Sequence, residues 1–160
     1  MLILLIRHAL AAEQDPEEYP DDALRPLLPK GRRIHRRVSR RLLQEGLVPD
    51  RVFSSPWKRA WQTARIVTDE TGIGKDKRFL CAALAEPPDL NALAAEIGPV
   101  EPDERVALVG HEPWMSGLAS MLLAGSPGGV SVDFPKSGVM GIQATLIEAG
   151  VGELRFFWRP

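Results

Sequence analysis

The chain has 160 residues, 44% of them apolar, which is enough to bury one sizeable core. Its formal net charge of −1 excludes a protein that binds nucleic acid through bulk positive charge. Its apolar runs are far too short for a membrane span, and its single cysteine, Cys81, cannot form an internal disulfide. We therefore expect a single domain over residues 1–160, cytoplasmic, with no membrane and no nucleic-acid partner.

The chain begins with a predicted strand. Residues 2–6 form an uninterrupted apolar run that ends at Arg7 and His8, which is typical of a central strand covered on both faces. Residues 11–29 are rich in proline and aspartate and predict a long loop. Loops of this length in compact domains are often functional.

An amphipathic helix is predicted for residues 30–45. Its apolar stripe consists of Ile34, Val38 and Leu42, which recur every four residues. Arginines occupy the other faces, and we expect His35 to lie among them on a solvated face. That arginine-rich face is interpreted either as a surface balanced by nearby acids or as a dock for an acidic protein partner.

A second strand and helix follow. Residues 51–54 predict a short strand, and residues 57–71 predict a helix that ends at Gly72. Pro56 suits the first helical position, and Ser55 suits the cap before it.

Further elements are expected in the second half of the chain. Residues 75–104 predict a short strand near Phe79 and a helix near residues 89–97. A buried strand at 105–109 is followed by a helix over roughly 113–124. The final strands are predicted from alternating patterns at 130–133, 141–147 and 153–158.

Alternation of strands and helices predicts an α/β fold, with three α/β/α layers and a mostly parallel central sheet. The last strands are expected to form an antiparallel edge or hairpin.

Basic side chains follow three of the predicted strands. Arg7 and His8 follow the first, Arg59 lies in the first turn of the helix after the second, and His111 follows strand 105–109. Because ligands of open α/β sheets bind beyond the carboxyl ends of the strands, we expect these side chains to share one site. A neutral imidazole is a competent nucleophile toward phosphorus, and arginine can grip two phosphoryl oxygens at once. The set predicts phosphoryl transfer.

Three segments resemble the histidine phosphatase superfamily, also called phosphoglycerate mutase-like. Residues 5–9 (LIRHA) are similar to its RH[GA] signature, residues 54–64 (SSPWKRAWQTA) to its SSPxxRAxQTA segment, and residues 109–113 (VGHEP) to its VGHxP segment. Their order and spacing agree with the family. The short length, and Arg25-Pro26-Leu27 followed by Lys30-Gly31, resemble the SixA-type phosphohistidine phosphatase branch.

The resemblance implies a phosphoglycerate mutase-like fold in which His8 accepts the phosphoryl group. Arg7, Arg59 and His111 would complete the phosphate pocket, and no metal or other cofactor is implied. Arg25 matches a loop arginine of the SixA-type branch and is a candidate substrate contact. The alternative for Arg25 is a plain loop arginine paired with Asp21 or Asp22.

A general acid is harder to place. Larger family members use a carboxylic acid to protonate the leaving oxygen, and Glu86 is the candidate in this sequence. A phosphorylated imidazole has a weak P–N bond and a nitrogen that solvent can protonate, so it needs less help than an alcohol ester. We therefore expect a preference for phosphoramidates.

Three functions remain open at this stage. The first is removal of phosphate from phosphohistidine of a partner protein, such as a phosphorelay domain. The second is hydrolysis of a small phosphate ester by the same mechanism, although the short chain leaves little room for a cap that would enclose a metabolite. The third is a non-catalytic module that binds phosphorylated partners, which would have no need of a nucleophile.

Overall fold

The computed structural model describes residues 1–160 and contains a six-stranded sheet with the order β3-β2-β4-β1-β5-β6. Neighbours from β3 to β1 run parallel, β5 is antiparallel to β1, and β6 is antiparallel to β5. The mostly parallel sheet and its antiparallel edge confirm the sequence prediction. The strands are β1 (Leu2–Arg7), β2 (Arg51–Ser54), β3 (Arg78–Leu80), β4 (Arg105–Gly110), β5 (Val139–Gln143) and β6 (Glu153–Trp158).

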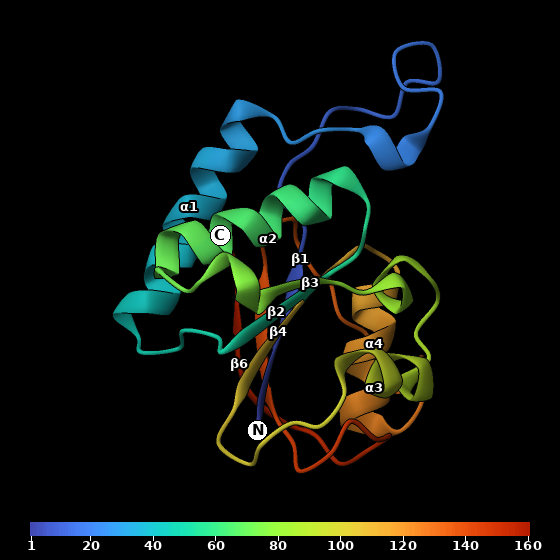
Figure 1. Cartoon of the computed structure of the whole chain (residues 1–160). Helices are drawn as coiled ribbons and strands as arrows, with labels where there is room; N and C mark the ends of the chain where they lie inside the picture. The colour runs from blue at the N-terminus through green and yellow to red at the C-terminus, as the bar shows by residue number, and fades with distance from the viewer.

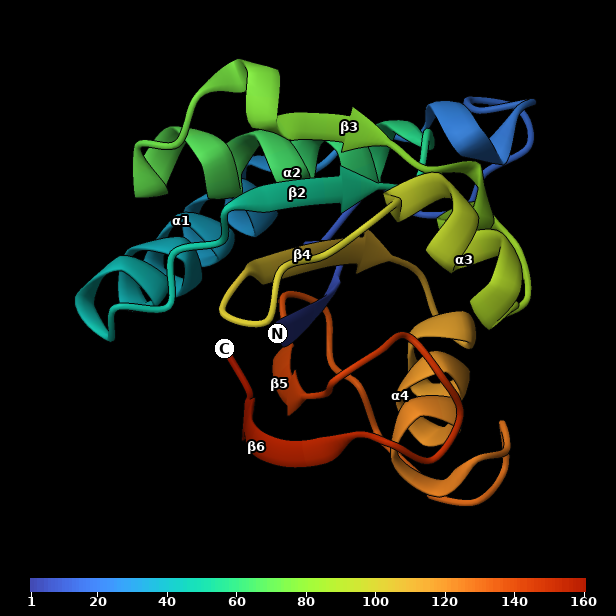
Figure 2. The same cartoon turned by 60° about the horizontal axis from the view of Figure 1, so that its bottom comes forward.

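Helices cover both faces of this sheet, which makes the three predicted layers (Figures 1 and 2). One face carries α1 (Pro29–Gln44) and α2 (Lys58–Thr71), and the other carries α3 (Leu90–Ile97) and α4 (Trp114–Ala124). Short 3-10 turns occupy Asp22–Leu24, Lys75–Lys77 and Ala82–Ala85. None of the helices has both the length and the apolar character needed to span a membrane.

Strand β1 shows why its apolar run is continuous. Successive side chains of a strand point to opposite faces. Ile3 and Leu5 therefore join the apolar cluster under α3 and α4, whereas Leu4 and Ile6 join the cluster under α1 and α2. A central strand covered on both faces has no position left for a polar side chain until it reaches its end.

The buried stripe of α1 differs from the prediction. Gly31, His35, Ser39 and Leu42 are the buried positions, so His35 is buried and does not lie on the arginine face. The cause is a close approach at the first turn, where a Cβ on Gly31 would lie 2.1 Å from the backbone oxygen of Leu10. This contact sets the rotation of the helix and turns His35 inward.

Two boundaries near the carboxyl terminus also differ. The predicted strand at 130–133 does not form, because its backbone bonds to side chains of α4 instead of to a neighbouring strand. The N–H of Val130 donates to Ser120 Oγ at 2.9 Å, and the carbonyl of Val132 accepts from Ser116 Oγ at 2.9 Å. The strand expected at 141–147 starts and ends earlier, as β5.

The start of α2 is also later than expected. The helix begins at Lys58, and Trp57 precedes it, so Pro56 is not in the first helical turn. Ser55 Oγ accepts a hydrogen bond from the N–H of Trp57 at 3.2 Å, which shapes the turn and does not cap the helix.

Replacement of Gly31 by alanine tests the close approach of α1. We expect Gly31→Ala to lower the free energy of unfolding by about 1–3 kcal/mol, because the added methyl group meets a backbone atom that cannot move away cheaply. Urea denaturation measures the effect. Gly128→Ala is the matched control, since nothing lies within 4 Å of its added Cβ. Equal stability of the two variants would contradict this account.

Burial of His35 predicts a pH-dependent stability. Burial lowers the pKa of His35 to about 4, below its ordinary value of 6.5, and neither ring nitrogen has a hydrogen-bond partner. The unfolded chain therefore binds more protons than the folded chain between these values, so stability falls as the pH drops through this window. His35→Leu should remove on the order of 3 kcal/mol of the loss between pH 7 and pH 4. Parallel pH profiles for wild type and variant would contradict it.

Candidate active site

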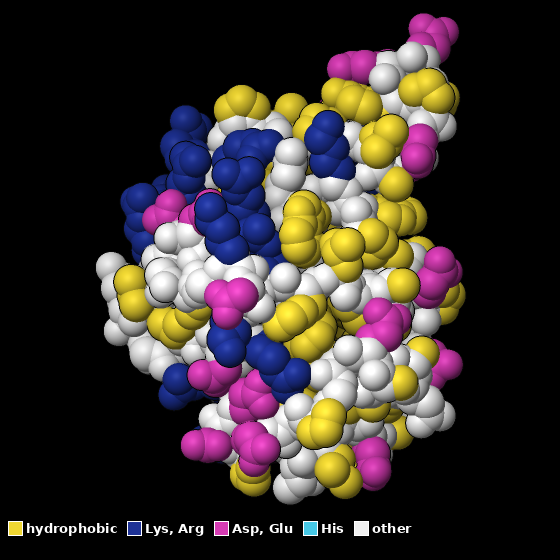
Figure 3. Space-filling model, viewed as in Figure 1, with side chains coloured by type: hydrophobic (Ala, Val, Ile, Leu, Met, Phe, Trp, Pro, Cys, Tyr) yellow, Lys and Arg dark blue, Asp and Glu magenta, His cyan; other side chains and the backbone are white.

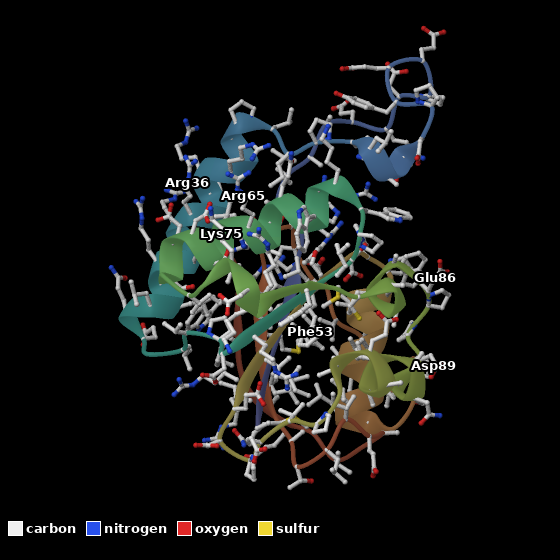
Figure 4. The ribbon with its side chains drawn as sticks, viewed as in Figure 1. Arg36, Phe53, Arg65, Lys75, Glu86 and Asp89 are labelled. Atoms are coloured by element: carbon white, nitrogen blue, oxygen red, sulfur yellow. The ribbon has the colours of Figure 1, made fainter.

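A pocket of about 640 Å³ opens beyond the carboxyl ends of the parallel strands. Five residues singled out from the sequence line it together, namely Arg7, His8, Arg25, Arg59 and His111. Glu86 is exposed and does not line the pocket. Figure 4 shows Glu86 on the outer side of the molecule near α3.

Backbone pairing fixes His8 at the end of β1. Its N–H donates to the carbonyl of Gly110 at 3.0 Å, and its carbonyl accepts from the N–H of Ser137 at 3.2 Å. Ser137 adopts a left-handed conformation with φ of 64°, which allows its N–H to approach Arg7 and His8 together. The turn before β5 therefore clamps the two residues that end β1.

The imidazole of His8 has one defined tautomer. Its Nδ1 lies 2.7 Å from the carbonyl oxygen of Ala9, and a carbonyl can only accept, so Nδ1 carries the hydrogen. Burial and the neighbouring cations lower the pKa of His8 to about 2, which keeps the ring neutral at physiological pH. The lone pair is consequently on Nε2.

Arg59 holds the next position in the pocket. Its Nε donates a hydrogen bond to His8 Nε2 at 3.3 Å, and its side chain is only 4% exposed. The other end of the guanidinium donates to Asp22, with Nη1 2.8 Å from the backbone oxygen and Nη2 3.0 Å from Oδ2. The guanidinium also lies 4.5 Å from the ring centroid of Trp57. These contacts fix its orientation from three sides.

Asp22 links Arg59 to the long loop. Its Oδ1 accepts from Arg25 Nε at 2.6 Å, while Arg25 Nη1 donates to the carbonyl of Ala12 at 2.6 Å. The hydrogen bond from Arg25, with the charge of Arg59, holds the pKa of Asp22 below its ordinary value. Arg25 thus pairs with Asp22, as one of the two sequence interpretations expected, and it also lines the pocket.

Gln62 and Thr63 of α2 secure the chain around the pocket. Thr63 Oγ1 accepts from the N–H of Ala9 at 3.0 Å, and Gln62 Oε1 accepts from the N–H of Leu27 at 2.8 Å. Gln62 and Thr63 lie in the helical turn that follows Arg59. Helix α2 therefore positions Arg59, the residues that follow β1 and the end of the 11–29 loop.

His111 lies opposite His8, with ring centroids 5.1 Å apart. Its Nε2 is 2.8 Å from Ser55 Oγ, and its ring stacks at a tilt 4.7 Å from Trp57. Burial, with Arg59 as the nearest cation, lowers its pKa to about 3. Its Nδ1 is buried with no hydrogen-bond partner. A polar atom in this state is costly unless a ligand satisfies it.

Arg7 and Lys136 complete the cationic lining. Arg7 Nη1 donates to the carbonyl of Phe134 at 2.6 Å, and its Nε is buried without a partner. Burial lowers the pKa of both side chains, and the three pocket arginines lower that of Lys136 further. Four cations therefore converge on one cavity, which is the electrostatic setting of an anion site.

Glu112 carries the pocket carboxyl whose pKa is raised, because it is half-buried. Ser116 Oγ lies 2.7 Å from Glu112 Oε2 and 2.9 Å from the carbonyl of Val132. A hydroxyl has one hydrogen and can donate to only one of these acceptors. A protonated Glu112 would donate to Ser116 Oγ, and the Ser116 hydroxyl would then donate to the carbonyl of Val132. The carboxyl, the hydroxyl and the carbonyl would all be hydrogen-bonded.

Sequence reasoning did not single out several of these residues. Asp22 was named only as a partner for Arg25, and Ser55 only as a helix cap. Of the three tryptophans that flank the motifs, Trp57 and Trp114 line the pocket, whereas Trp61 lies against Arg78. The position of Glu112 directly after His111 was the one available signal for it.

The arrangement suits a tetrahedral dianion. It offers a neutral imidazole whose Nε2 lone pair accepts only a long hydrogen bond from Arg59, arginines that can donate to several oxygens, and a buried nitrogen that lacks a partner. No group of three or more His, Cys, Asp or Glu side chains lies in an arrangement that could hold a metal ion.

The chain is similar to a known protein family and to a cyanobacterial protein. Residues 3–80 match the model of the histidine phosphatase superfamily (branch 1). An uncharacterized protein of Picosynechococcus sp. (strain PCC 7002) is 32% identical over 146 residues, which cover 90% of this chain and 86% of that protein.

Solved structures share the fold at lower identity. The protein histidine phosphatase SixA complexed with tungstate is 23% identical with a TM-score of 0.81, over 100% of this chain and 97% of that one. A mycobacterial glucosyl-3-phosphoglycerate phosphatase is 17% identical with a TM-score of 0.69, over 96% of each chain. The family-model match over residues 3–80, the sheet topology shared with these structures and the motif residues gathered in one pocket together support assignment of the chain to the histidine phosphatase superfamily.

Proposed function

We propose that this protein is a phosphatase that forms a phosphorylated His8 and removes phosphate from phosphohistidine of a partner protein. The observation that carries the proposal is the state of His8. Its ring is neutral, its Nδ1 hydrogen is held by Ala9, and its Nε2 lone pair lies at the base of a cationic pocket beside Arg59. A nucleophile must present a lone pair to the phosphorus, and this ring has one available without losing a proton first.

The reaction proceeds in two displacements. His8 Nε2 attacks the phosphorus, a new P–N bond forms, and the bond between phosphorus and the substrate imidazole breaks. The leaving nitrogen takes its electron pair and is protonated. Water then attacks the phosphorus of phospho-His8, the P–N bond to Nε2 breaks, and inorganic phosphate leaves with His8 restored.

Arg7, Arg59 and His111 bind the phosphoryl oxygens in this proposal. Charge on the equatorial oxygens is stabilised by preorganised donors that need not reorganise during the reaction. Arg59 is fixed by its contacts with Asp22 and Trp57. Nδ1 of His111 gains a partner when it donates to a phosphoryl oxygen, and the negative charge of the phosphate raises the pKa of that ring from its low value in the free protein.

Protonation of the leaving group favours a phosphoramidate substrate. Glu86 lies outside the pocket and cannot reach a leaving group there without rearrangement. Glu112 is the pocket carboxyl held nearest to its neutral form, but both of its oxygens bond to Ser116. The free ring nitrogen of a phosphorylated imidazole can take a proton from solvent near neutral pH, so the imidazole leaves neutral without a dedicated acid. An ester oxygen is too weak a base for this and would leave as an alkoxide unless an acid protonated it.

The walls of the pocket favour a protein substrate over a small metabolite. Ends of strands, starts of helices and the 11–29 loop line it, with no inserted cap to enclose a free ligand. Chain extent alone does not separate the two substrates, because the match covers 97% of the SixA structure and 96% of the glucosyl-3-phosphoglycerate phosphatase. The alternative is a small phosphate ester, as the name of the structurally similar glucosyl-3-phosphoglycerate phosphatase would suggest.

Phosphate release tests the proposal directly. We expect wild type to dephosphorylate a phosphohistidine-bearing protein and phosphoimidazole faster than an aryl phosphate. His8→Ala should reduce all three rates to background because the nucleophile is gone, and Arg59→Ala should lower kcat about 10²–10³-fold. A quench in alkaline detergent should trap base-stable, acid-labile phosphate on wild type, and His8→Ala should trap none.

Three outcomes would decide between the functions. Faster hydrolysis of sugar or serine phosphates than of phosphohistidine would favour the metabolite alternative. Unchanged turnover in His8→Ala would refute the phosphorylated intermediate. Tight binding of phosphorylated protein by wild type, without release of phosphate, would favour a binding module.

Asp22 provides a second test, because it holds Arg59 and partly neutralises the pocket. We expect Asp22→Asn to lower kcat about tenfold as Arg59 loses its fixed orientation, a loss typical of one charge-assisted contact. The same variant should be inhibited by severalfold lower concentrations of inorganic phosphate, because the pocket becomes more positive. Steady-state kinetics with phosphoimidazole measure both effects.

Asp21→Asn is the matched control, since Asp21 is an exposed neighbour whose side chain bonds only to the N–H of Ala23. Asp21→Asn removes one negative charge, as Asp22→Asn does, but Asp21 contacts neither Arg25 nor Arg59. A kcat for Asp22→Asn equal to that of Asp21→Asn would show that Asp22 does not position Arg59.

A further inference from the structure

Positive charge is concentrated on one side of a chain whose formal net charge is −1. Figure 3 shows Lys and Arg side chains gathered over α1 and α2, with few acidic side chains among them. Helix α1 carries Lys30 and six arginines and has no acidic residue within its bounds, the arginines being Arg32, Arg33, Arg36, Arg37, Arg40 and Arg41.

Ion pairs neutralise three of the seven cations of α1. Arg36 and Arg40 share Glu70 of α2 at 3.5 and 2.7 Å, and Arg41 lies 4.0 Å from Glu45. The four cations of α1 without an ion pair are Lys30, Arg32, Arg33 and Arg37, and Lys58 at the start of α2 also has none.

Lys30 and Arg32 in the first turn of α1, and Lys58 at the start of α2, lie where a helix least favours a cation. The amino end of a helix carries a partial positive charge, so acids stabilise the first turn and cations destabilise it by about 0.3–1 kcal/mol each. Both α1 and α2 lack an acid in the first turn and begin with cations. Because these cations destabilise the amino ends of two neighbouring helices, their role is not to stabilise the helices.

Both helices start beside the pocket. Leu28, the residue before α1, and Trp57, the residue before α2, line the pocket, as does Arg59. Lys30, Arg33 and Arg37 are spaced three and four residues apart and share one exposed face of α1. The unpaired charge thus extends outward from the place where a phosphoryl group would bind.

We propose that Lys30, Arg33, Arg37 and Lys58, here termed the basic rim, dock an acidic surface around the phosphohistidine of the partner protein. The proposal rests on the proposed function and specifies its substrate. Complementary charge attracts the partner before contact and raises the association rate, whereas a small phosphoramidate occupies the pocket alone and gains little from the rim.

Opposite charge on the other side of the pocket sets the orientation of the partner. The 11–29 loop exposes Glu13, Asp15, Glu17, Glu18 and Asp21. An acidic partner surface is repelled there and attracted over α1 and α2. The pocket therefore lies between a negative and a positive border, and one orientation of the partner satisfies both.

Three synthetic peptides with a central phosphohistidine test the basic rim. They have equal length and carry glutamate, glutamine or lysine on both sides of the phosphohistidine. We expect kcat/KM to be about tenfold higher for the glutamate peptide than for the glutamine peptide at low salt, and lowest for the lysine peptide. The preference should disappear as added salt shortens the screening length from about 10 Å toward 3 Å.

Charge reversal identifies the surface. Arg33→Glu/Arg37→Glu should abolish or invert the order of the three peptides and leave phosphoimidazole hydrolysis unchanged. Arg33→Gln/Arg37→Gln should give an intermediate result and guards against a folding defect. Lys75→Glu/Lys77→Glu is the control, because it changes the net charge equally beyond the far end of α2, a helix of 14 residues or about 20 Å. This control should keep the wild-type order.

Distinct results would overturn the two proposals. Hydrolysis of phosphoimidazole with equal kcat/KM for all three peptides refutes docking and leaves the phosphatase intact. No hydrolysis of any phosphoramidate refutes the proposed function, and binding of the labelled, unphosphorylated peptides then tests the rim alone, with equal affinities refuting it. Tighter binding of a single-stranded oligonucleotide than of the glutamate peptide would show that the rim serves a nucleic acid and not an acidic protein.

Discussion

The pairing of β1 with β4 is the constraint on which the site depends. Arg7 pairs with Gly110 in parallel register, and the N–H of His8 bonds to the carbonyl of Gly110 at 3.0 Å. His8 follows β1 and His111 follows β4, so this pairing places the two residues side by side. Their ring centroids are 5.1 Å apart. Gly110 leaves no room for a larger residue without a shift, because an added Cβ would lie 2.6 Å from the sulfur of Met115. The strand pairing thus sets the distance between the two rings that bind the phosphoryl group in the proposed function.

Holding these groups together without their ligand is unfavourable, and the structure limits the loss in two ways. Burial keeps both imidazoles neutral, with pKa values of about 2 for His8 and about 3 for His111, so they add no positive charge to a pocket already lined by arginines. Asp22 supplies one carboxylate between Arg25 and Arg59. Arg7 Nε and His111 Nδ1 remain buried without a hydrogen-bond partner, so part of the cost of the free site is not offset within the protein.

The fold and the main site residues follow from the sequence because they depend on local patterns. Arg7, His8 and His111 end apolar runs, and parallel strands place such ends at one edge of a sheet. Asp22 could not be assigned to Arg59 in the same way, since the path of a 19-residue loop depends on contacts between distant segments. The buried position of His35 also depends on a distant contact, that of Gly31 with Leu10. Periodicity indicated a buried face of α1 but not its rotation.

The starts of α1 and α2 connect the chemistry of the pocket to recognition beyond it. Arg59 lies in the first turn of α2, where backbone N–H groups already favour an anion, and the basic rim continues that field along the surface. A cation in such a place destabilises its own helix when no anion is present and becomes favourable when one binds. Helix α2 is also held by the hydrogen bonds of Thr63 with Ala9 and of Gln62 with Leu27 in the loop. These contacts offset part of the destabilisation by the cations at its first turn. In the two proposals, the same helix binds the phosphoryl group at its first turn and attracts a charged surface outside the pocket, and neither role requires a moving part.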